Sequence, residues 1–464
     1  NKLDGLGYLT AMQTGTKPYS RMQVAGWGAQ MTADLAKRPA MPAYARQMLA
    51  ELQTELGPEL AILRGDKPQA AFALKELSFG EVYYHGRTLQ QHHTKSTYQP
   101  LNINNNGYKY GDSANEIVAF RAEGRLSDHL IASVTPRLSY DDTQAARFTL
   151  DYGYIKTHIN NMAIQIGKDA DWWGQGTRGS MLWTNNAEPQ IAIKLSNIQP
   201  QGMHGFLKFL GKSNYVISYS VLETDRSDVR YPSFLGIRKD FTPTENFTFA
   251  LAQASIIGGE GHMLTGGDYY DWAWGKNNDS DAGEPDKWNS IAGADFRLRI
   301  PKWNNIQLYG DFYGEDRHRH IVPYPYKIGK MQGIYIPRLT PSGDWDARFE
   351  HHETSRYWYV HGLYTDGWIY EGNIIGNAIG YNADSYYAQF TKYINGSQIS
   401  FNFERLKMDN NSATQQKVTS YWIDWKTRLE KDLSLKSSVG VAKTEDQNRS
   451  SRNYLFSAMI TKNF

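Results

Sequence analysis

The chain has 464 residues, of which 40% are hydrophobic and 13% aromatic, and it contains no cysteine. Its formal net charge of +2 gives no electrostatic case for a nucleic acid partner. No stretch approaches the ~18 consecutive apolar residues that a spanning helix needs, which excludes helical membrane proteins. The lack of cysteine excludes disulfide frameworks and thiolate metal sites. Because the chain begins at Asn1 without a charged and apolar leader, we expect that any signal peptide has been removed.

Residues 1–76 are expected to form a small α-helical bundle. Ser20 is followed three residues later by Gln23, which is the spacing of a capping box, and apolar residues then recur at helical spacing as far as Leu35. A second helix is predicted to start after Pro42, because proline suits the first helical turn. Both helices are short and amphipathic, so we expect them to pack on each other and on a larger domain.

From about residue 77 to the end of the chain, apolar and polar residues alternate with a period of two. Between residues 292 and 300, for example, Phe296 and Leu298 alternate with Asp295, Arg297 and Arg299. A single strand of this kind equally fits a soluble antiparallel sheet with one face in water. The repetition of this pattern over residues 77–464 does not fit a soluble sheet, because soluble sandwiches rarely exceed ~200–250 residues as one domain. A closed barrel in lipid, apolar outside and polar inside, explains the pattern.

Short and long connections alternate between the predicted strands, as in outer-membrane barrels. Short turns are expected near Glu430, Gly396, Asp366, Pro301, Pro243 and Gly211, and long loops at roughly 88–114, 258–288, 314–355 and 407–417. The parity of the strands also requires an extra strand within residues 169–189, for which the segment RGSMLWT is the candidate. The count is then about twenty strands, or about eighteen without the weak ones.

The sequence therefore predicts an all-β transmembrane barrel of about eighteen antiparallel strands over residues 77–464, with long extracellular loops. The helical bundle of residues 1–76 would face the periplasm. The best alternation is in the last strand, where Tyr454, Phe456, Ala458, Ile460 and Phe464 fall on one side. We expect its aromatic end to lie at the periplasmic interface of a bacterial outer membrane, where aromatic girdles occur.

The terminal aromatic residue on the last strand resembles the assembly signal of bacterial outer-membrane barrels. Three segments resemble the capsule assembly Wzi family: TGTKPYSRMQVA (14–25), DWWGQGTRGSMLWTNNAEP (171–189) and IIGGEGH (256–262). The resemblance covers most of the chain. It implies an outer-membrane lectin that binds group 1 (K30-type) capsular polysaccharide and anchors the capsule to the cell surface. It also implies a barrel of eighteen strands with a plugged lumen, and it transfers no catalytic residues.

Charged residues recur on the face of the strands that is predicted to line the lumen. We interpret them as a structural network in which opposite charges pair across strands; the alternative is an ion or solute path. The set comprises Arg121, Glu123, Arg125, Asp295, Arg297, Arg299, Asp424, Lys426 and Arg428.

Aromatic residues in two predicted loops are candidates for polysaccharide contacts. Their faces can stack on the C–H faces of sugars, while nearby basic residues can pair with uronic acid carboxylates. The alternative for each tryptophan is packing in the plug or at the membrane interface. One group holds Trp172, Trp173 and Arg178, and the other holds Trp272, Trp274, Lys276 and Trp288.

A basic patch with Arg317 and Arg319 is expected in an extracellular loop. Its histidines His318 and His320, with His351 and His352, could hold a metal only if they converged, and the arginines would repel a cation. Arginine suits an anionic polysaccharide or a lipopolysaccharide phosphate better. We therefore expect no metal and no other cofactor.

No G-x-S-x-G, H-E-x-x-H or P-loop motif occurs, so the chain is not expected to be an enzyme. The expected partners are acidic capsular polysaccharide and the lipid or lipopolysaccharide of the outer membrane, with the protein a monomer. The alternative function is an outer-membrane diffusion channel resembling a porin.

Overall fold

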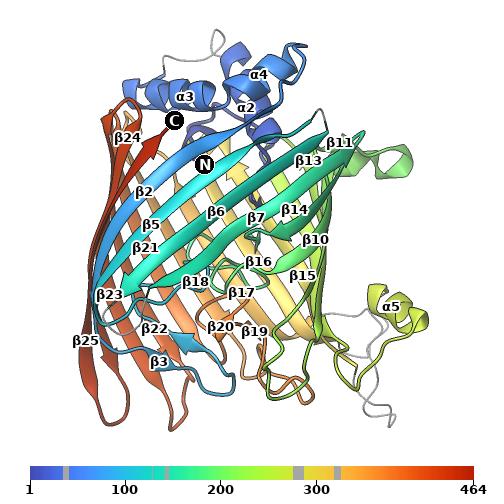
Figure 1. The fold of residues 1–464 in the computed structure, drawn as a ribbon, viewed down its shortest axis with the longest axis vertical. Helices are drawn as coiled ribbons and strands as arrows, with labels where there is room; N and C mark the ends of the chain where they lie inside the picture. Colours follow the sequence, from blue (N-terminus) through green and yellow to red (C-terminus); the bar gives the residue numbers. More distant parts are fainter. Residues whose placement is uncertain (35–40, 128, 142–145, 275–286, 318–324) are drawn as a thin grey trace.

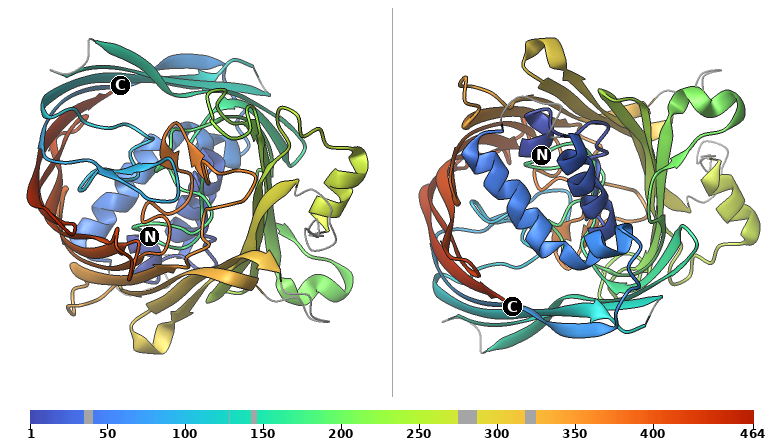
Figure 2. Two further views of the ribbon diagram at one scale, coloured as in Figure 1. Left: turned by 90° about the horizontal axis from the view of Figure 1, so that it is seen from below. Right: turned by 90° about the horizontal axis from the view of Figure 1, so that it is seen from above.

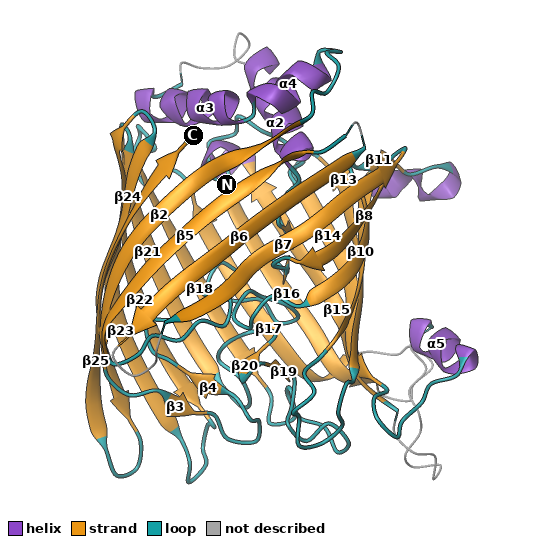
Figure 3. Cartoon of the chain, viewed as in Figure 1, coloured by secondary structure: helices purple, strands orange, loops and turns teal. Residues whose placement is uncertain are grey.

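The computed structural model describes residues 1–34, 41–127, 129–141, 146–274, 287–317 and 325–464. Within these residues, eighteen long antiparallel strands close into a barrel (Figures 1 and 3), and the predicted fold class is confirmed. The strands are β2 (Ala71–His85), β5 (Ser113–Arg125), β6 (Leu130–Asp141), β7 (Arg147–Ile159), β8 (Met162–Lys168), β10 (Ile191–Asn197), β12 (Lys212–Val221), β13 (Ser233–Thr244), β14 (Phe247–Ile257), β15 (Trp288–Ile300), β16 (Ile306–Arg317), β17 (Pro325–Ile336), β18 (Trp345–Thr354), β21 (Asp384–Ile394), β22 (Ser397–Met408), β23 (Gln416–Glu430), β24 (Leu433–Glu445) and β25 (Ser450–Asn463).

The barrel closes where β25 pairs with β2 on one side and with β24 on the other. Phe79 lies opposite Ile460 and Tyr83 lies opposite Phe456, and all four side chains are exposed. Asn453, on the opposite face of β25, is fully buried. The period-two alternation of the sequence thus sets an apolar face outward and a polar face inward, which is the arrangement required in lipid.

Short helices lie across one end of the barrel, which we call the helical end (Figure 2, right). Tyr44 stacks on Tyr393 of the barrel with ring centroids 5.8 Å apart, and its hydroxyl donates to the carbonyl of Gly343 at 2.7 Å. No described helix is long and apolar enough to cross a membrane. The helices are α1 (Lys2–Gly5), α2 (Arg21–Asp34), α3 (Ala43–Glu55) and α4 (Gly57–Leu63).

Residues 1–17 pack against α2 and α3 through an apolar cluster that includes Leu6, Leu9 and Met12, and they also enter the lumen. Asp4 is 1% exposed and pairs with Arg297 of β15 at 2.6 Å. The strand β2 begins at Ala71, earlier than the expected boundary at residue 77. The first segment thus connects the helices with the barrel interior, and the division of the chain into two domains stays a prediction.

Two long connections fold into the lumen and form a plug (Figure 2, left). Residues 169–190 contribute no strand to the wall, so the extra strand predicted there is wrong. Residues 355–383 contain Asp366, which was expected in a short turn, and residues 325–354 form two wall strands where a long loop was expected. The reason is burial: Trp173, Trp358 and Trp368 are each 0% exposed in one apolar cluster.

Further short elements belong to the plug and to the loops. The ribbons are β1 (Thr16–Lys17) with β9 (Trp172–Trp173), β3 (Leu89–Gln90) with β4 (Thr97–Tyr98), and β19 (Ile369–Tyr370) with β20 (Asn373–Ile374). The strand β11 (Gln201–Gly202) adds a short pairing to β12. The helices η2 (Gly205–Leu210), α5 (Gly266–Ala273) and η4 (Pro301–Trp303) lie in connections between wall strands. The end opposite the helices carries β3, β4, β19 and β20 (Figure 3), and we call it the long-loop end.

Candidate functional site

The plug is tied to the N-terminal segment inside the lumen. Thr16 pairs with Trp173 and Lys17 with Trp172 in the two-stranded ribbon β1–β9. The amide of Gly174 also donates to the carbonyl of Gly15 at 2.8 Å. Segments that enter from the two ends of the barrel therefore meet through backbone hydrogen bonds within it.

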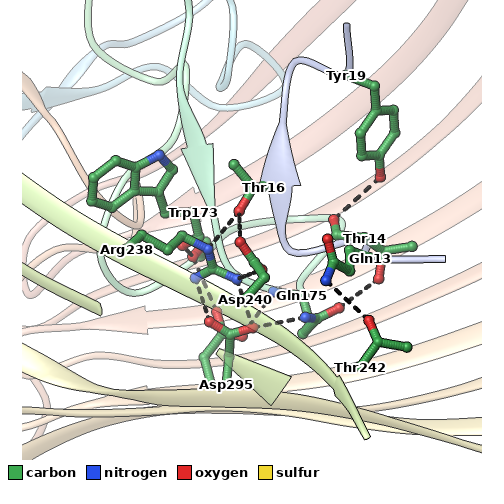
Figure 4. A network of polar contacts seen from close by, with 12 residues as sticks. Gln13, Thr14, Thr16, Tyr19, Trp173, Gln175, Arg238, Asp240, Thr242 and Asp295 are labelled. Atoms are coloured by element: carbon green, nitrogen blue, oxygen red, sulfur yellow. Dashed lines mark hydrogen bonds and ion pairs between the residues drawn. The ribbon is translucent and has the colours of Figure 1, made fainter. Parts of the chain in front are cut away.

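A buried arginine holds this meeting point to the wall (Figure 4). Arg238 of β13 is 0% exposed, and it pairs with Asp295 at 2.5 Å and with Asp240 at 2.9 Å. Its Nε donates to Thr16 Oγ1 at 2.6 Å, while Gln175 Nε2 of the plug donates to Asp295 Oδ1 at 2.7 Å. Each of these three groups has ion-pair and hydrogen-bond partners, so the network ties the N-terminal segment and the plug to the wall.

Most of the other predicted lumen charges also have partners. Arg297 pairs with Asp4, and Arg299 donates to the carbonyl of Leu9 at 2.7 Å. The remaining partners within the described residues are Glu76 and Glu123 for Arg121, Ser438 and Asn402 for Asp424, and Glu51 for Arg428. Arg125 is the last residue of β5, and Lys426 lies opposite Lys436 on the neighbouring strand.

The predicted aromatic group at 172–178 lies in the plug. Trp173 packs against Trp183 with ring centroids 5.1 Å apart, and the Nζ of Lys17 lies 4.9 Å from the ring of Trp172. Arg178 pairs with Glu404 at 2.7 Å. These contacts hold the group within the plug, and its predicted contact with a polysaccharide stays a prediction.

The second aromatic group lies at the side of the barrel near α5. Trp272 and Trp288 are buried together with Ile257, and Trp272 Nε1 donates to Ser255 Oγ at 2.6 Å. Trp274 is 68% exposed. Polysaccharide contacts of this group also stay a prediction.

In the predicted basic patch, Arg319, His318 and His320 lie outside the described residues. Lys276 of the second aromatic group also lies outside them. Arg317 is the last residue of β16. The neighbouring histidines of β18 point to opposite faces: His351 bonds to Asp384 at 3.2 Å, whereas the buried His352 bonds to Glu350 at 3.1 Å. This pair does not converge on a common ligand.

A small hollow at the long-loop end, whose volume of about 10 Å³ admits about one water molecule, is lined by amides, hydroxyls and one ammonium group. It forms where the connections 86–112, 169–190 and 355–383 meet, and the amide of Asn106 donates to the carbonyl of Asn185 there at 2.8 Å. Amide and hydroxyl groups in convergent positions are the groups that fix a sugar through its hydroxyls. The lining residues are Thr97, Tyr98, Gln99, Asn102, Ile103, Asn104, Asn105, Gly107, Tyr108, Lys109, Asn186 and Asn373.

The asparagine run NINNNGY shapes this hollow. Asn104 and Asn106 adopt positive φ of 56° and 51°, a conformation that asparagine tolerates better than most residues. The side chain of Asn102 then closes the turn by donating to the carbonyl of Tyr108 at 2.9 Å. The run thus folds as a tight local structure that presents its side chains together.

Three polar atoms of the hollow's lining have no hydrogen-bond partner among the described residues. They are Oδ1 of Asn104 and the hydroxyls of Tyr98 and Tyr108, and all three are buried. A buried polar atom without a partner costs roughly 1–3 kcal/mol, which a ligand hydroxyl that reaches it could recover. Beside them, burial lowers the pKa of Lys109 to about 8.

Exposed pairs of a cation and an aromatic ring surround this end of the barrel. The guanidinium of Arg230 lies 5.4 Å from the ring of Tyr231, and that of Arg356 lies 5.1 Å from the ring of Tyr357. His93 stacks on Tyr381 with centroids 4.2 Å apart. Such pairs offer a stacking face beside a positive charge.

The sequence interpretation assigned the segment around 88–114 to a loop but did not select any of its residues for binding. A signal was present, because three consecutive asparagines followed by Gly-Tyr-Lys-Tyr are unusual in one loop. Asn186 and Asn373 carry no comparable signal, since only the folded chain brings them to the same place.

Comparison with known proteins identifies the family of this chain. Residues 84–454 match the model of the family described as capsule assembly protein Wzi. The chain belongs to the Wzi family. The predicted resemblance is thereby confirmed.

One solved structure and one further sequence show how similar this chain is to known proteins. A solved structure of Wzi from Escherichia coli has 17% identity and a TM-score of 0.76, and the match covers 100% of this chain and 96% of that one. That protein is described as an outer-membrane protein involved in group 1 capsule assembly and as a carbohydrate-binding β-barrel. An uncharacterized protein from the cps region of Klebsiella pneumoniae is 24% identical over 195 residues, which are 41% of this chain and 38% of that relative.

Proposed function

We propose that this chain is an outer-membrane lectin that binds acidic capsular polysaccharide of group 1 (K30 type) and anchors the capsule to the cell surface. The observation that carries the proposal is the asparagine-lined hollow with Lys109 at the long-loop end. In this proposal the long-loop end faces outward and the helical end faces the periplasm. Binding takes place without catalysis.

The groups around the hollow have the chemistry that an acidic sugar requires. In this proposal the loops move apart on binding, so that Asn104, Asn373 and Tyr108 bond to sugar hydroxyls. Lys109 then exchanges its contacts with Thr97 and the carbonyl of Gly372 for a uronate carboxylate. The exposed pairs Arg230–Tyr231 and Arg356–Tyr357 add stacking contacts around it. Each contact is weak, but a repeating polymer engages several at once, and the avidity multiplies them.

The test is retention of the purified, detergent-solubilised protein on immobilised acidic capsular polysaccharide, with neutral dextran as the competitor. We expect selective retention that falls by roughly tenfold in Lys109→Ala, since a charge-assisted hydrogen bond of about 1.5–3 kcal/mol is lost. The matched control is Lys302→Ala, which removes an exposed lysine from η4. No retention of the unaltered protein at low salt would contradict the proposal.

The alternative function, a diffusion channel, makes an opposite prediction. The buried cluster of Trp173, Trp358 and Trp368 fills part of the lumen, and the network around Arg238 holds the plug to the wall. We therefore expect planar bilayers with the unaltered protein to show no stable pore conductance. A steady conductance together with absent polysaccharide retention would favour the channel.

A further inference from the structure

Five basic side chains gather on the outer wall of the barrel near the long-loop end. They lie on β22, β23, β24 and β25, the strands at the lower left of Figure 1. Four of the five are exposed and Lys407 is half-buried, whereas the alternate residues of the same strands, such as Glu404, Val418 and Asn453, are buried toward the lumen. We call this set the basic wall: Arg405, Lys407, Lys417, Lys443 and Arg452.

The strand register places the residues of the basic wall side by side. Arg405 lies opposite Thr419, Thr419 opposite Lys443, and Lys443 opposite Arg452, so that one row crosses four strands. Lys407 lies directly opposite Lys417 in the next row toward the long-loop end. Like charges in directly opposed positions destabilise a sheet, so the arrangement calls for an anionic partner.

The protein supplies part of that negative charge itself. Glu445 lies opposite Lys417 and pairs with Lys443 at 2.6 Å. Asp384, which lies opposite Lys407, is engaged by His351 at 3.2 Å. Within the described residues no carboxylate forms an ion pair with Arg405, Lys407, Lys417 or Arg452.

An apolar belt lies directly beside the basic wall, on the side toward the helical end. The adjacent row across the same four strands is Phe403, Tyr421, Val441 and Tyr454, and the row after it is Phe401, Ile423, Val439 and Phe456. Successive rows on one face are about 7 Å apart along a strand. The basic wall therefore sits about one row beyond the lipid-facing belt, at the depth of lipid headgroups.

We propose that the basic wall binds the phosphate groups of a phosphorylated glycolipid of the outer leaflet, a lipopolysaccharide, whose acyl chains lie on the apolar belt. Arg405 and Arg452 can each form bidentate contacts to phosphate, and the lysines add point charges. The proposal rests on the orientation given under the proposed function, with the long-loop end outward. It does not depend on polysaccharide binding by the asparagine-lined hollow.

The position of the wall favours lipid over the acidic capsular polymer as the occupant. Its side chains point sideways from the barrel, next to exposed aromatic residues that only lipid chains would cover. The asparagine-lined hollow lies where the long loops contact one another, on a different part of the same end. A polymer leaving the mouth would extend away from the membrane and away from this wall.

The test compares binding of bis-phosphorylated lipid A, dephosphorylated lipid A and phosphatidylglycerol to the detergent-solubilised barrel by native mass spectrometry. The variant is Arg405→Gln with Lys417→Gln and Arg452→Gln, and the control is Lys302→Ala with Lys431→Ala, two exposed lysines in turns at the helical end. Removing opposed like charges should not impair folding. Unchanged migration of the unheated protein in gels checks that the barrel is intact.

We expect the unaltered protein and the control to prefer bis-phosphorylated lipid A over the dephosphorylated form by at least about tenfold, because charge-assisted hydrogen bonds to phosphate are lost in the latter. The triple variant should lose this preference. Equal binding of both lipid A forms, equal binding of phosphatidylglycerol, or an unchanged triple variant would each overturn the proposal.

Retention on capsular polysaccharide is measured in parallel to separate this proposal from the first. We expect the triple variant to retain the polysaccharide as the unaltered protein does. Loss of polysaccharide retention with lipid A binding intact would assign the wall to the polymer and overturn the lipid assignment. Absence of polysaccharide retention in every protein would contradict only the lectin function and leave the lipid result standing.

Discussion

Thr16 and Trp173 lie opposite each other in a two-stranded ribbon inside the barrel, although one belongs to the N-terminal segment and the other to a connection between wall strands. Thr16 Oγ1 donates to Asp240 at 2.6 Å and accepts from Arg238, also at 2.6 Å. The ribbon therefore joins the chain that leads to the helical end with the plug of the long-loop end.

Gly15→Ala is expected to weaken this junction. A Cβ at this position would lie 2.2 Å from Nη2 of Arg238 and 2.6 Å from Nε2 of Gln175, so the network must shift, at a cost of roughly 1–3 kcal/mol. The control is Gly26→Ala, because a Cβ there meets nothing within 4 Å and the residue lies inside α2. We expect the control to be neutral or stabilising by about 0.5–1 kcal/mol. Thermal unfolding followed by circular dichroism tests both, and equal midpoints would contradict the prediction.

Arg238→Ala should destabilise the plug more strongly. The change leaves Asp240 and Asp295 buried without their cation, which costs roughly 3–5 kcal/mol. The comparison is Arg230→Ala, whose pair with Glu260 is about half exposed and contributes at most about 1 kcal/mol. Protease sensitivity of residues 169–190 in the intact barrel is the measurement. Equal sensitivity of the two variants would show that the buried network does not hold the plug.

Polysaccharide retention should fall as pH rises from about 7 to 9.5. Burial lowers the pKa of Lys109 to about 8, so the ammonium is present below that pH and is lost above it, while uronate carboxylates stay ionised throughout. Lys109→Arg should abolish this pH dependence, because arginine stays charged over the whole range. Identical pH profiles for the two proteins would remove Lys109 from the binding site.

Removal of residues 1–66 should open the lumen to ions. The deletion ends before β2 begins at Ala71, so the wall strands stay complete, while β1 and the helices of the helical end are lost. Conductance in planar bilayers is the measurement, with Gly26→Ala as a folded control. If the deletion protein stays non-conducting, residues 169–190 and 355–383 close the lumen without the N-terminal segment.

The wall of the barrel could be predicted from the sequence because its signal is local. Side chains alternate between the two faces of a strand, so the faces of Phe296 and Asp295 can be assigned without knowing which strands pair with theirs. The strand number was close for the same reason. The errors came where alternation also occurs in the plug, as around Trp183, or where a hairpin-type dipeptide such as Asp366-Gly367 lies in a long connection.

The candidate site could be predicted only in part. The segment 171–189 was selected for its aromatic and glycine residues, and the structure places Trp173 and Arg178 inside the plug. The hollow combines Asn104, Asn186 and Asn373 from three connections, and its existence depends on how those connections pack. No pattern within one segment specifies that meeting.

The sequence alone thus determined a barrel with an apolar outer face, a charged inner face and membership of the Wzi family, because strand periodicity and family motifs are properties of short stretches. Only the tertiary structure decided that Thr16 meets Trp173 in the lumen, and that Arg405, Lys443 and Arg452 form one row on the outer wall. Those relationships join residues far apart in the chain. They are set by burial of the plug and by strand register, which no single stretch encodes.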